Sequence, residues 1–186
     1  MYFHRKKAGR SNEAILQEII GLKSKSVVEI ENYVIKNLGS KSLETDNDIS
    51  RFMTPDELTI FAQNPLVHIG NHSHKHEILT NLTLEEVQKE LEISQQILEK
   101  LLGYKTNLIS YPNGSFDENI ISVSVELGMN IGITTIMEKN YFPLDNRVNG
   151  QLLLHRFNPV VHNGNMHLSK FRSSFQLKTQ LKKWLN

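Results

Sequence analysis

Three histidines stand at alternate positions within Val67–Leu79, a stretch that reads Val-His-Ile-Gly-Asn-His-Ser-His-Lys-His-Glu-Ile-Leu. They are His72, His74 and His76, and they directly follow a run whose alternating apolar residues predict a strand over Leu66–Gly70. Imidazole is the commonest metal ligand that proteins offer. A cluster of imidazoles at the end of a strand therefore indicates a metal-binding site.

The conformation after this strand decides which histidines can bind one ion. In a helix or helical turn, His72 and His76 are four residues apart and lie on one face, while His74 points elsewhere. In a continued strand, all three would share one face. We favour the helical turn, because Gly70-Asn71 is typical of a strand end and a helical pattern begins soon afterwards at Leu82. The predicted ligands are then the first and third histidines.

Two histidines with an acidic third ligand and a water molecule form the open kind of zinc site that catalyses hydrolysis. Two blander interpretations remain open. One is a polar surface turn that happens to be rich in histidine. The other is a loose chelating tract, in which His68, His72, His74 and His76 hold nickel or zinc without a defined fold.

The composition is that of an ordinary globular domain. The chain has 186 residues, of which 39% are hydrophobic and 22% charged. Its formal net charge of +1 gives no overall field that would attract nucleic acid or an anionic membrane. The chain has no cysteine, which excludes disulfides but leaves the compartment open between the cytoplasm and export. Met1–Arg10 is basic and is followed by an amphipathic pattern, so no signal peptide or transmembrane span is visible.

The order of elements predicts an α/β fold. Hydrophobic periodicity and capping residues predict helices at Ser11–Leu22, Val27–Leu38, Thr54–Gln63, Leu82–Leu102, Asp117–Leu127 and Leu168–Leu185. Further strands are predicted at Asn107–Ser110, Met129–Ile136 and Gln151–Phe157. This alternation predicts a parallel sheet or barrel of βα units. Sites in such folds gather at the C-terminal ends of strands, where both the histidines and the turn Tyr111-Pro112-Asn113-Gly114 lie.

Two of these stretches resemble the signatures of a known family. Gly70-Asn71-His72-Ser73-His74-Lys75-His76 resembles the second signature, H-[ST]-x-x-H, of the polysaccharide deacetylases, also called the NodB-homology domain or carbohydrate esterase family 4. Met53–Leu58 and Asn64–Gly70 look like the helix and strand that lead into it. Ser110-Tyr111-Pro112-Asn113-Gly114 resembles the third signature, whose usual form is R-P-P-[YF]-G and whose form in the exopolysaccharide branch is A-Y-P-Y-G.

The resemblance implies a role for each matching residue. His72 and His76 would bind a divalent metal such as Zn²⁺. The turn lines the acetyl pocket in the family, so Tyr111 and Pro112 would contact the substrate, and the backbone amide of Asn113 would donate to the oxyanion. Asn113 stands where the family usually has an aromatic residue, a change that keeps the main-chain donor but alters the pocket wall.

A second pair of polar residues lies near the end of the predicted strand Gln151–Phe157. By position this strand resembles the L-P-R-[IF] strand of the exopolysaccharide branch, and less closely the L-x-H strand that supplies a general acid. Arg156 is predicted to face the site as an orienting or anion-pairing group. His155 is either the general acid or a surface histidine at a strand end.

One signature of the family is not found in this sequence. Members begin with a strand ending in T-F-D-D-G, whose first aspartate is the general base and whose second binds the metal, and this sequence contains no such motif. The resemblance therefore implies an incomplete (β/α) barrel without the first strands and with extra N-terminal helices. The expected organisation is a helical segment over 1–50 packed on a partial deacetylase domain over 51–186. The carboxylates nearest to the site in sequence are Asp117, Glu77 and Asp145, and we assign none of them to catalysis.

A parallel sheet that lacks two strands has an open edge. The N-terminal helices could cover this edge, or two copies of the chain could pair there as a homodimer. A third interpretation is that the upstream piece is a separate chain, or that this sequence is a fragment of a longer protein.

The sequence predicts a metal-dependent hydrolase that removes acetyl groups from the N-acetylated sugars of a polysaccharide. Such a reaction requires a metal to polarise the acetamide carbonyl, a base for the attacking water, donors for the oxyanion, and an acid for the leaving amine. This sequence offers the two imidazoles and the oxyanion donor, but not the base or the carboxylate ligand. The alternative is a catalytically inactive relative, or a fragment, that at most binds carbohydrate.

Overall fold

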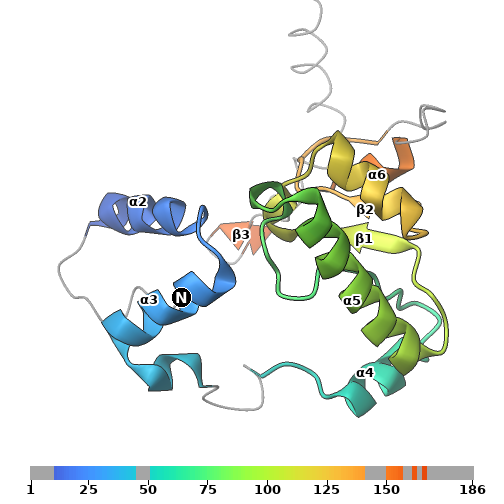
Figure 1. Cartoon of the computed structure of the whole chain (residues 1–186), viewed down its shortest axis with the longest axis horizontal. Helices are drawn as coiled ribbons and strands as arrows, with labels where there is room; N and C mark the ends of the chain where they lie inside the picture. The colour runs from blue at the N-terminus through green and yellow to red at the C-terminus, as the bar shows by residue number, and fades with distance from the viewer. Residues whose placement is uncertain (1–10, 45–50, 141–149, 157–160, 163–164, 167–186) are drawn as a thin grey trace, which may run out of the picture.

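The computed structural model describes residues 11–44, 51–140, 150–156, 161–162 and 165–166. The α-helices in these ranges are α2 (Asn12–Leu22), α3 (Val27–Leu38), α4 (Pro55–Ala62), α5 (Leu84–Leu102) and α6 (Glu118–Glu126). The strands are β1 (Leu108–Ser110), β2 (Ile131–Ile133), β3 (Val161–His162) and β4 (Asn165–Met166). In Figure 1, α2 and α3 lie to one side, and α4, α5, α6 and the β1–β2 sheet form the other part of the molecule.

The helices begin and end close to the residues that the sequence signals predict. Ser26, Thr54 and Thr83 are the N-caps of α3, α4 and α5, and each forms a capping box with a glutamate three residues later. Asp117 caps α6 by accepting a hydrogen bond from a first-turn amide. Helix α5 ends at Gly103, which adopts the left-handed conformation. These signals are local, so the predictions for these helices are confirmed.

The central sheet is parallel and small. β1 and β2 pair in parallel, one isolated parallel bridge joins Asn71 to Ile109 of β1, and another joins Leu154 to Ile133 of β2. The order across the sheet is therefore Asn71, β1, β2, Leu154, with all four segments running the same way. Their C-terminal ends meet at one rim, where sites form in parallel α/β folds.

The strands are shorter than the sequence pattern predicts. The described structure has no strand over Leu66–Gly70, since pairing starts only at Asn71, and Leu66 is 88% exposed. β2 occupies only the middle of the predicted Met129–Ile136. In the last predicted strand, a 3-10 helix at Gly150–Leu153 precedes a single bridge. Strand formation depends on the neighbouring segments more than on intrinsic preference, which explains these errors.

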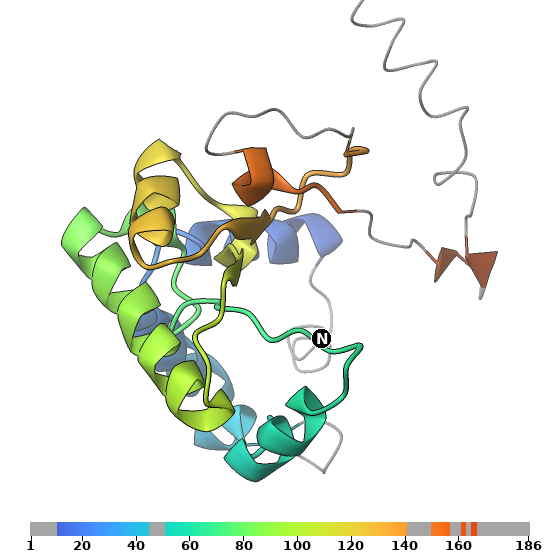
Figure 2. The same cartoon turned by 90° about the vertical axis from the view of Figure 1, so that its right-hand side faces the viewer.

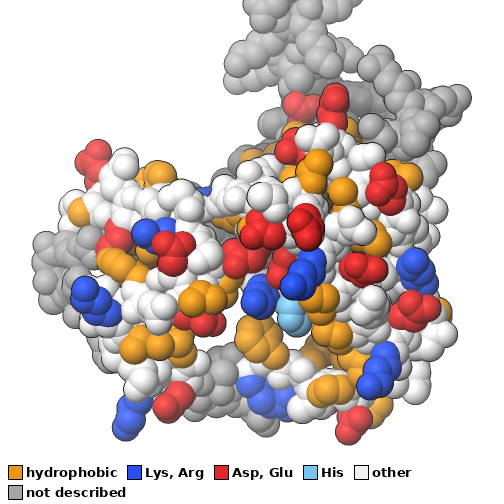
Figure 3. All heavy atoms as spheres, viewed as in Figure 1, with side chains coloured by type: hydrophobic (Ala, Val, Ile, Leu, Met, Phe, Trp, Pro, Cys, Tyr) orange, Lys and Arg blue, Asp and Glu red, His pale blue; other side chains and the backbone are white. Residues whose placement is uncertain are grey.

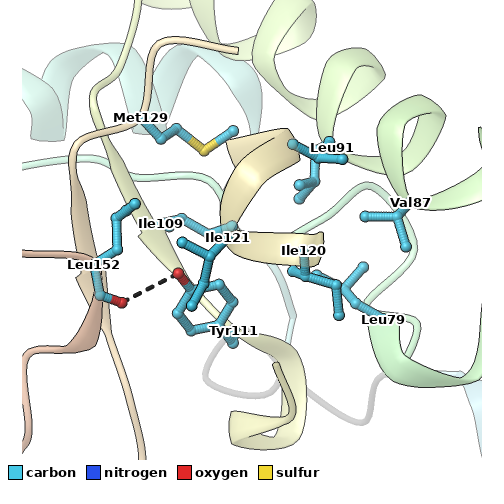
Figure 4. Close-up of a cluster of buried hydrophobic side chains, with 10 residues drawn as sticks. Leu79, Val87, Leu91, Ile109, Tyr111, Ile120, Ile121, Met129 and Leu152 are labelled. Carbon is cyan, nitrogen blue, oxygen red and sulfur yellow. Dashed lines mark hydrogen bonds between the residues drawn. The ribbon is translucent and has the colours of Figure 1, made fainter. Parts of the chain in front are cut away.

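A cluster of buried apolar side chains joins α5 and α6 to one face of the sheet, as Figure 4 shows. Its members are Leu79, Val87, Leu91, Ile109, Tyr111, Ile120, Ile121, Val123, Met129 and Leu152. Figure 2 likewise shows α5 and α6 on the same side of the strands. The alternate residues Leu108 and Ser110 point to the other face and are only half-buried. The core therefore covers one face of β1 and leaves the other partly open.

Helices α2 and α3 join the rest of the molecule through the segment that follows His76. The carboxylate of Glu77 accepts hydrogen bonds from the amide of Val27 at 3.0 and 3.2 Å, at the start of α3. The side chain of Asn81 donates to the carbonyl of Lys23 at 2.8 Å. Helix α3 buries none of its own residues. Ile15 and Leu22 of α2 are buried, but neither belongs to the cluster of apolar side chains at the sheet. The division of this part from the rest at residue 50 stays a prediction.

None of the described helices is long and apolar enough to cross a membrane. The amphipathic helix predicted over Leu168–Leu185 lies outside the described residues.

Candidate metal centre

The side chains of His72 and His76 lie against each other at the C-terminal rim of the sheet. Their ring centroids are 4.8 Å apart and their planes are inclined at 77°. Nδ1 of His72 lies 2.5 Å from the carbonyl oxygen of Ser110, the last residue of β1. A carbonyl oxygen only accepts hydrogen bonds, so Nδ1 of His72 is the donor, and in the neutral ring the lone pair is then on Nε2. Metal-binding histidines usually donate their second nitrogen to such a carbonyl.

The loop that brings the two rings together is irregular, so the predicted helical turn is wrong. Ser73 and His76 have left-handed φ values of 60° and 58°. Side chains bond the amides of this loop, since Asn71 Oδ1 accepts from the amide of Ser73 at 2.9 Å and Glu90 of α5 accepts from the next two amides. Side-chain acceptors of this kind compete with helical hydrogen bonds. The rings meet because of this loop conformation and not because of helical spacing.

Asn71 fixes the start of the loop. Its buried side chain donates to the carbonyl of Leu91 at 2.8 Å and to Oε1 of Gln95 at 3.3 Å, both on α5. Gln95 in turn donates to the carbonyl of Thr106 at 2.5 Å, two residues before β1. This buried network joins the loop, α5 and the approach to β1. Satisfied polar networks of this kind specify one arrangement of their surroundings.

The other two histidines of this stretch face different surroundings. His74 lines a pocket of about 330 Å³ together with Lys75 and side chains of the first half of α5. His68 lines another pocket of about 230 Å³, at the N-terminal side of β1 and β2. The residues that the structure describes contain no group of three or more histidines and carboxylates that could hold a metal. The histidines therefore form a pair rather than a cluster of four within this part of the chain.

The turn after β1 lies beside the histidine pair. Asn113 has a left-handed φ of 55°, which asparagine adopts more readily than most residues. Gly114 is also left-handed, and a Cβ atom there would lie 2.0 Å from Oγ1 of Thr135, so only glycine fits. The amide of Gly114 bonds back within the turn, whereas the Asn113 amide makes no backbone hydrogen bond with the described residues. This amide can therefore donate to a ligand.

Tyr111 and Pro112 support this turn from the core side. Both are buried, and the hydroxyl of Tyr111 donates to the carbonyl of Leu152 at 3.1 Å. Its ring packs 5.1 Å from the ring of Phe116. Burial raises the pKa of the Tyr111 hydroxyl to about 12. A contact of these two residues with a substrate stays a prediction.

His155 and Arg156 follow the far edge of the sheet. At about 4.8 Å per strand spacing, three spacings place this edge about 14 Å along the sheet from Asn71, the residue before the histidine pair. Nδ1 of His155 is buried, lies 3.8 Å from a carboxylate oxygen of Glu138, and has no hydrogen-bond partner among the described residues. Arg156 is exposed. The structure does not bring these two residues to the pair, and their roles in catalysis stay predictions.

Two residues that shape the site were missed from the sequence. Asn71 could have been noticed, because it stands directly before the first histidine at the end of an apolar run. Glu90 gave no signal, because a glutamate on the polar face of a long helix is common and its partners are distant in sequence.

Known proteins share both the sequence and the fold of this region. A sequence profile described as polysaccharide deacetylase matches residues 11–132, more than half of the chain. This range contains the histidine pair and the turn at Asn113, and it ends before His155 and Arg156.

Individual relatives match smaller parts. The peptidoglycan-N-acetylmuramic acid deacetylase PdaC of Bacillus subtilis is 37% identical over 54 residues, which are 29% of this chain and 12% of PdaC. The deacetylase PplD of Streptococcus pyogenes, solved in complex with acetate, matches with a TM-score of 0.50 and 23% identity over 56% of this chain and 43% of its own. The polysaccharide deacetylase BC0361 of Bacillus cereus matches with a TM-score of 0.51 and 17% identity, over 67% and 41%.

This chain spans less than half the length of each of these proteins. The likeness to the solved structures shows the fold: these deacetylases are (β/α) barrels, and the described part of this chain is a helix-rich α/β domain similar to a portion of them. The resemblance seen in the two signatures is thereby confirmed. By the extent of the profile match, the chain belongs to the polysaccharide deacetylase family.

Proposed function

We propose that His72 and His76 bind a divalent metal, of which Zn²⁺ suits imidazole best, in a hydrolase that deacetylates the N-acetylated sugars of a polysaccharide. The observation that carries the proposal is the contact between the two rings, 4.8 Å apart, with Nδ1 of His72 bonded to the Ser110 carbonyl. With Nδ1 as the donor to this carbonyl, Nε2 is the ring nitrogen of His72 that a metal would bind, in the deprotonated form that a metal ligand takes.

The residues at this rim fit the imidazole half of such a site. A bound metal would polarise the acetamide carbonyl and lower the pKa of a bound water. The exposed turn at Asn113 offers an amide that can donate to the oxygen on which negative charge develops. Tyr111 and Pro112 would form the wall beside the acetyl group, with Arg156 and His155 further along the rim as orienting and acid groups.

The substrate class follows from family membership. PdaC is named for peptidoglycan N-acetylmuramic acid, so peptidoglycan fragments and N-acetylglucosamine oligomers are the first substrates to try. Turnover also needs a base and an acidic metal ligand. This sequence contains no T-F-D-D-G, and the described residues place no carboxylate with the pair as a third ligand.

This missing motif favours a second candidate function, a relative that binds metal and carbohydrate without turnover. The two candidates share the metal site and differ only in acetate release. Measuring zinc binding and acetate release in one sample therefore distinguishes the two candidate functions.

The test uses the purified chain, loaded with Zn²⁺ and incubated with an N-acetylglucosamine oligomer. We expect about one zinc per chain by elemental analysis. Acetate release that disappears in His72→Ala would support the deacetylase, and zinc binding without release would support the binding relative. A chain that contains no metal, binds no added Zn²⁺ and shows no rise in melting temperature would overturn both.

A homodimer is a further part of the proposal. Phe52 is 93% exposed, and Ile60 and Leu66 are also exposed, all in the segment that leads along the chain to Asn71, the first residue to pair at the sheet edge. A second copy would remove these side chains from water. Light scattering should then give a dimer that dissociates in Leu66→Lys, and a monomer at all concentrations would contradict it.

A further inference from the structure

The conformation of the histidine loop is intrinsically unfavourable. Ser73 and His76 both have positive φ, where the Cβ of an ordinary residue crowds the backbone. Neither residue is a glycine, and the segment has no helical or ladder hydrogen bonds of its own. Contacts from elsewhere in the chain must therefore hold it.

Helix α5 supplies these contacts at two points. The first is the pair of acceptors on Leu91 and Gln95 to which the buried side chain of Asn71 donates. The second is Glu90, whose Oε2 accepts hydrogen bonds from the amides of His74 at 3.1 Å and Lys75 at 2.8 Å. These two residues lie between the histidines of the pair. Hydrogen bonds from amides to a charged carboxylate are stronger than those to a neutral acceptor.

Glu90 has no competing partner in the described structure. It forms no ion pair with a described residue, although the neighbouring pocket is also lined by Lys75 and Lys89. Figure 3 shows acidic and basic side chains gathered around a histidine on this face. The two loop amides are the hydrogen-bond partners that the structure gives Glu90.

The position of Glu90 relates it to both rings. On the N-terminal side of the two amides that Glu90 binds, His72 is fixed by Asn71 and the Ser110 carbonyl. On their C-terminal side, the position of His76 depends on the conformation of residues 73–75, because the next residue, Glu77, is bonded to the start of α3. The structure gives His76 no hydrogen bond with a described residue. If the amides of residues 74 and 75 are released, the bond of the Ser73 amide to Asn71 is what remains in this segment, three residues before His76.

We propose that Glu90 is a positioning residue for the histidine pair, which holds residues 74 and 75 so that the imidazoles of His72 and His76 stay in contact. The proposal rests on the proposed metal site for its functional consequence. Its structural content concerns the metal-free protein and can be tested separately. Outer contacts of this kind commonly change metal affinity 10–100-fold.

The test compares Glu90→Ala and Glu90→Gln with the matched control Glu92→Ala, which removes an exposed glutamate from the same helix. Alanine favours helix, so α5 should form in each variant. If Glu90→Ala does not fold by circular dichroism, Glu90→Met replaces it, since methionine keeps the bulk of the side chain without an acceptor.

The first readout is the metal-free protein in imidazole ¹⁵N NMR. The wild type and Glu92→Ala should show His72 protonated on Nδ1, with cross-relaxation between the rings of His72 and His76. Glu90→Ala should lose the contact between the rings, and Glu90→Gln, which retains an oxygen acceptor, should keep most of it. An unchanged ring contact in Glu90→Ala would overturn the proposal.

The second readout is titration with Zn²⁺ by calorimetry. Glu90→Ala should bind about 10–100-fold more weakly than the wild type, with a smaller loss in Glu90→Gln and none in Glu92→Ala. Equal affinity of Glu90→Ala and wild type would overturn the positioning role. If the wild type binds no zinc, the proposed function is wrong. The NMR comparison in the metal-free protein would still decide the role of Glu90.

Discussion

Two segments meet at the rim of the sheet, and they are held by different kinds of interaction. The turn at Tyr111–Gly114 rests on a buried aromatic side chain that belongs to the hydrophobic core (Figure 4). The loop at His72–His76 is mostly exposed and is held by hydrogen bonds that its amides donate to the side chains of Asn71 and Glu90. The proposed oxyanion donor thus lies on a segment anchored in the core, and the proposed metal ligands lie on a segment that needs less free energy to move.

The two segments should therefore differ in how easily they open. Segments with few buried apolar contacts open at lower free energy than core elements. The proposed metal would itself order the histidine loop, because binding stabilises the conformation that binds. The turn needs no such help, since burial of Tyr111 already fixes it.

The largest expected loss of stability comes from removing the aromatic side chain that supports the turn at Tyr111–Gly114. Tyr111→Ala should lower the free energy of unfolding by about 3–5 kcal/mol, because it leaves a cavity in the core and an unpaired Leu152 carbonyl. The exposed Tyr104 provides the control, and Tyr104→Ala should change stability by about 0.5 kcal/mol or less. Urea unfolding measures both. Equal effects of the two substitutions would show that the turn does not rest on the core.

The next effect concerns the buried anchor of the histidine loop. Asn71→Ala should cost about 1–3 kcal/mol, because it leaves polar groups of α5 and the loop without partners. Asn119→Ala, on the exposed side of α6, serves as the control. Hydrogen exchange should show faster opening of the loop than of the turn. Equal acceleration in both would contradict the distinction between them.

A smaller, pH-dependent effect separates the core contribution of the tyrosine ring from that of its hydroxyl. Burial raises the pKa of Tyr111 to about 12, so the folded state holds its proton more tightly than the unfolded state does. Its contribution to stability is complete below pH 10 and falls as the pH rises from 10 to 12. Tyr111→Phe should cost about 1 kcal/mol at neutral pH and reduce this alkaline loss. An identical alkaline profile in wild type and variant would show that the hydroxyl is not buried.

The smallest effect should come from the far end of the histidine loop. Glu77→Ala removes the acceptor of the Val27 amide and should cost about 0.5–1 kcal/mol. Hydrogen exchange should rise in the first turn of α3 and stay unchanged in α5. Protection of α3 equal to that of the wild type would mean that the N-terminal helices are held in some other way.

Much of this molecule was predictable because its signals are local. The caps Ser26, Thr54 and Thr83 and the stop at Gly103 lie next to the helices they bound. The two signatures also lie in short stretches, so the family and the relevant rim of the sheet could be inferred from them.

The rest depends on contacts between distant residues. The predicted strand Leu66–Gly70 forms no strand pairing with the described residues, and the predicted helical turn after it is an irregular loop. That loop depends on Glu90, 15 and 16 residues from its partners, and on a buried amide network with Gln95. No local pattern in the sequence reveals either contact. The sequence therefore predicts, from an incorrect geometry, the two histidines whose rings lie together, and their role as metal ligands stays a prediction.

The most direct test is zinc titration of His72→Ala and His76→Ala beside His74→Ala, which removes the histidine of the same loop that faces another pocket. All three positions are exposed, so stability without metal should change by about 0.5 kcal/mol or less. We expect both outer substitutions to abolish zinc binding and its rise in melting temperature, while His74→Ala binds like the wild type. Equal loss in all three variants, or undiminished binding in His72→Ala, would contradict the pair as the metal site.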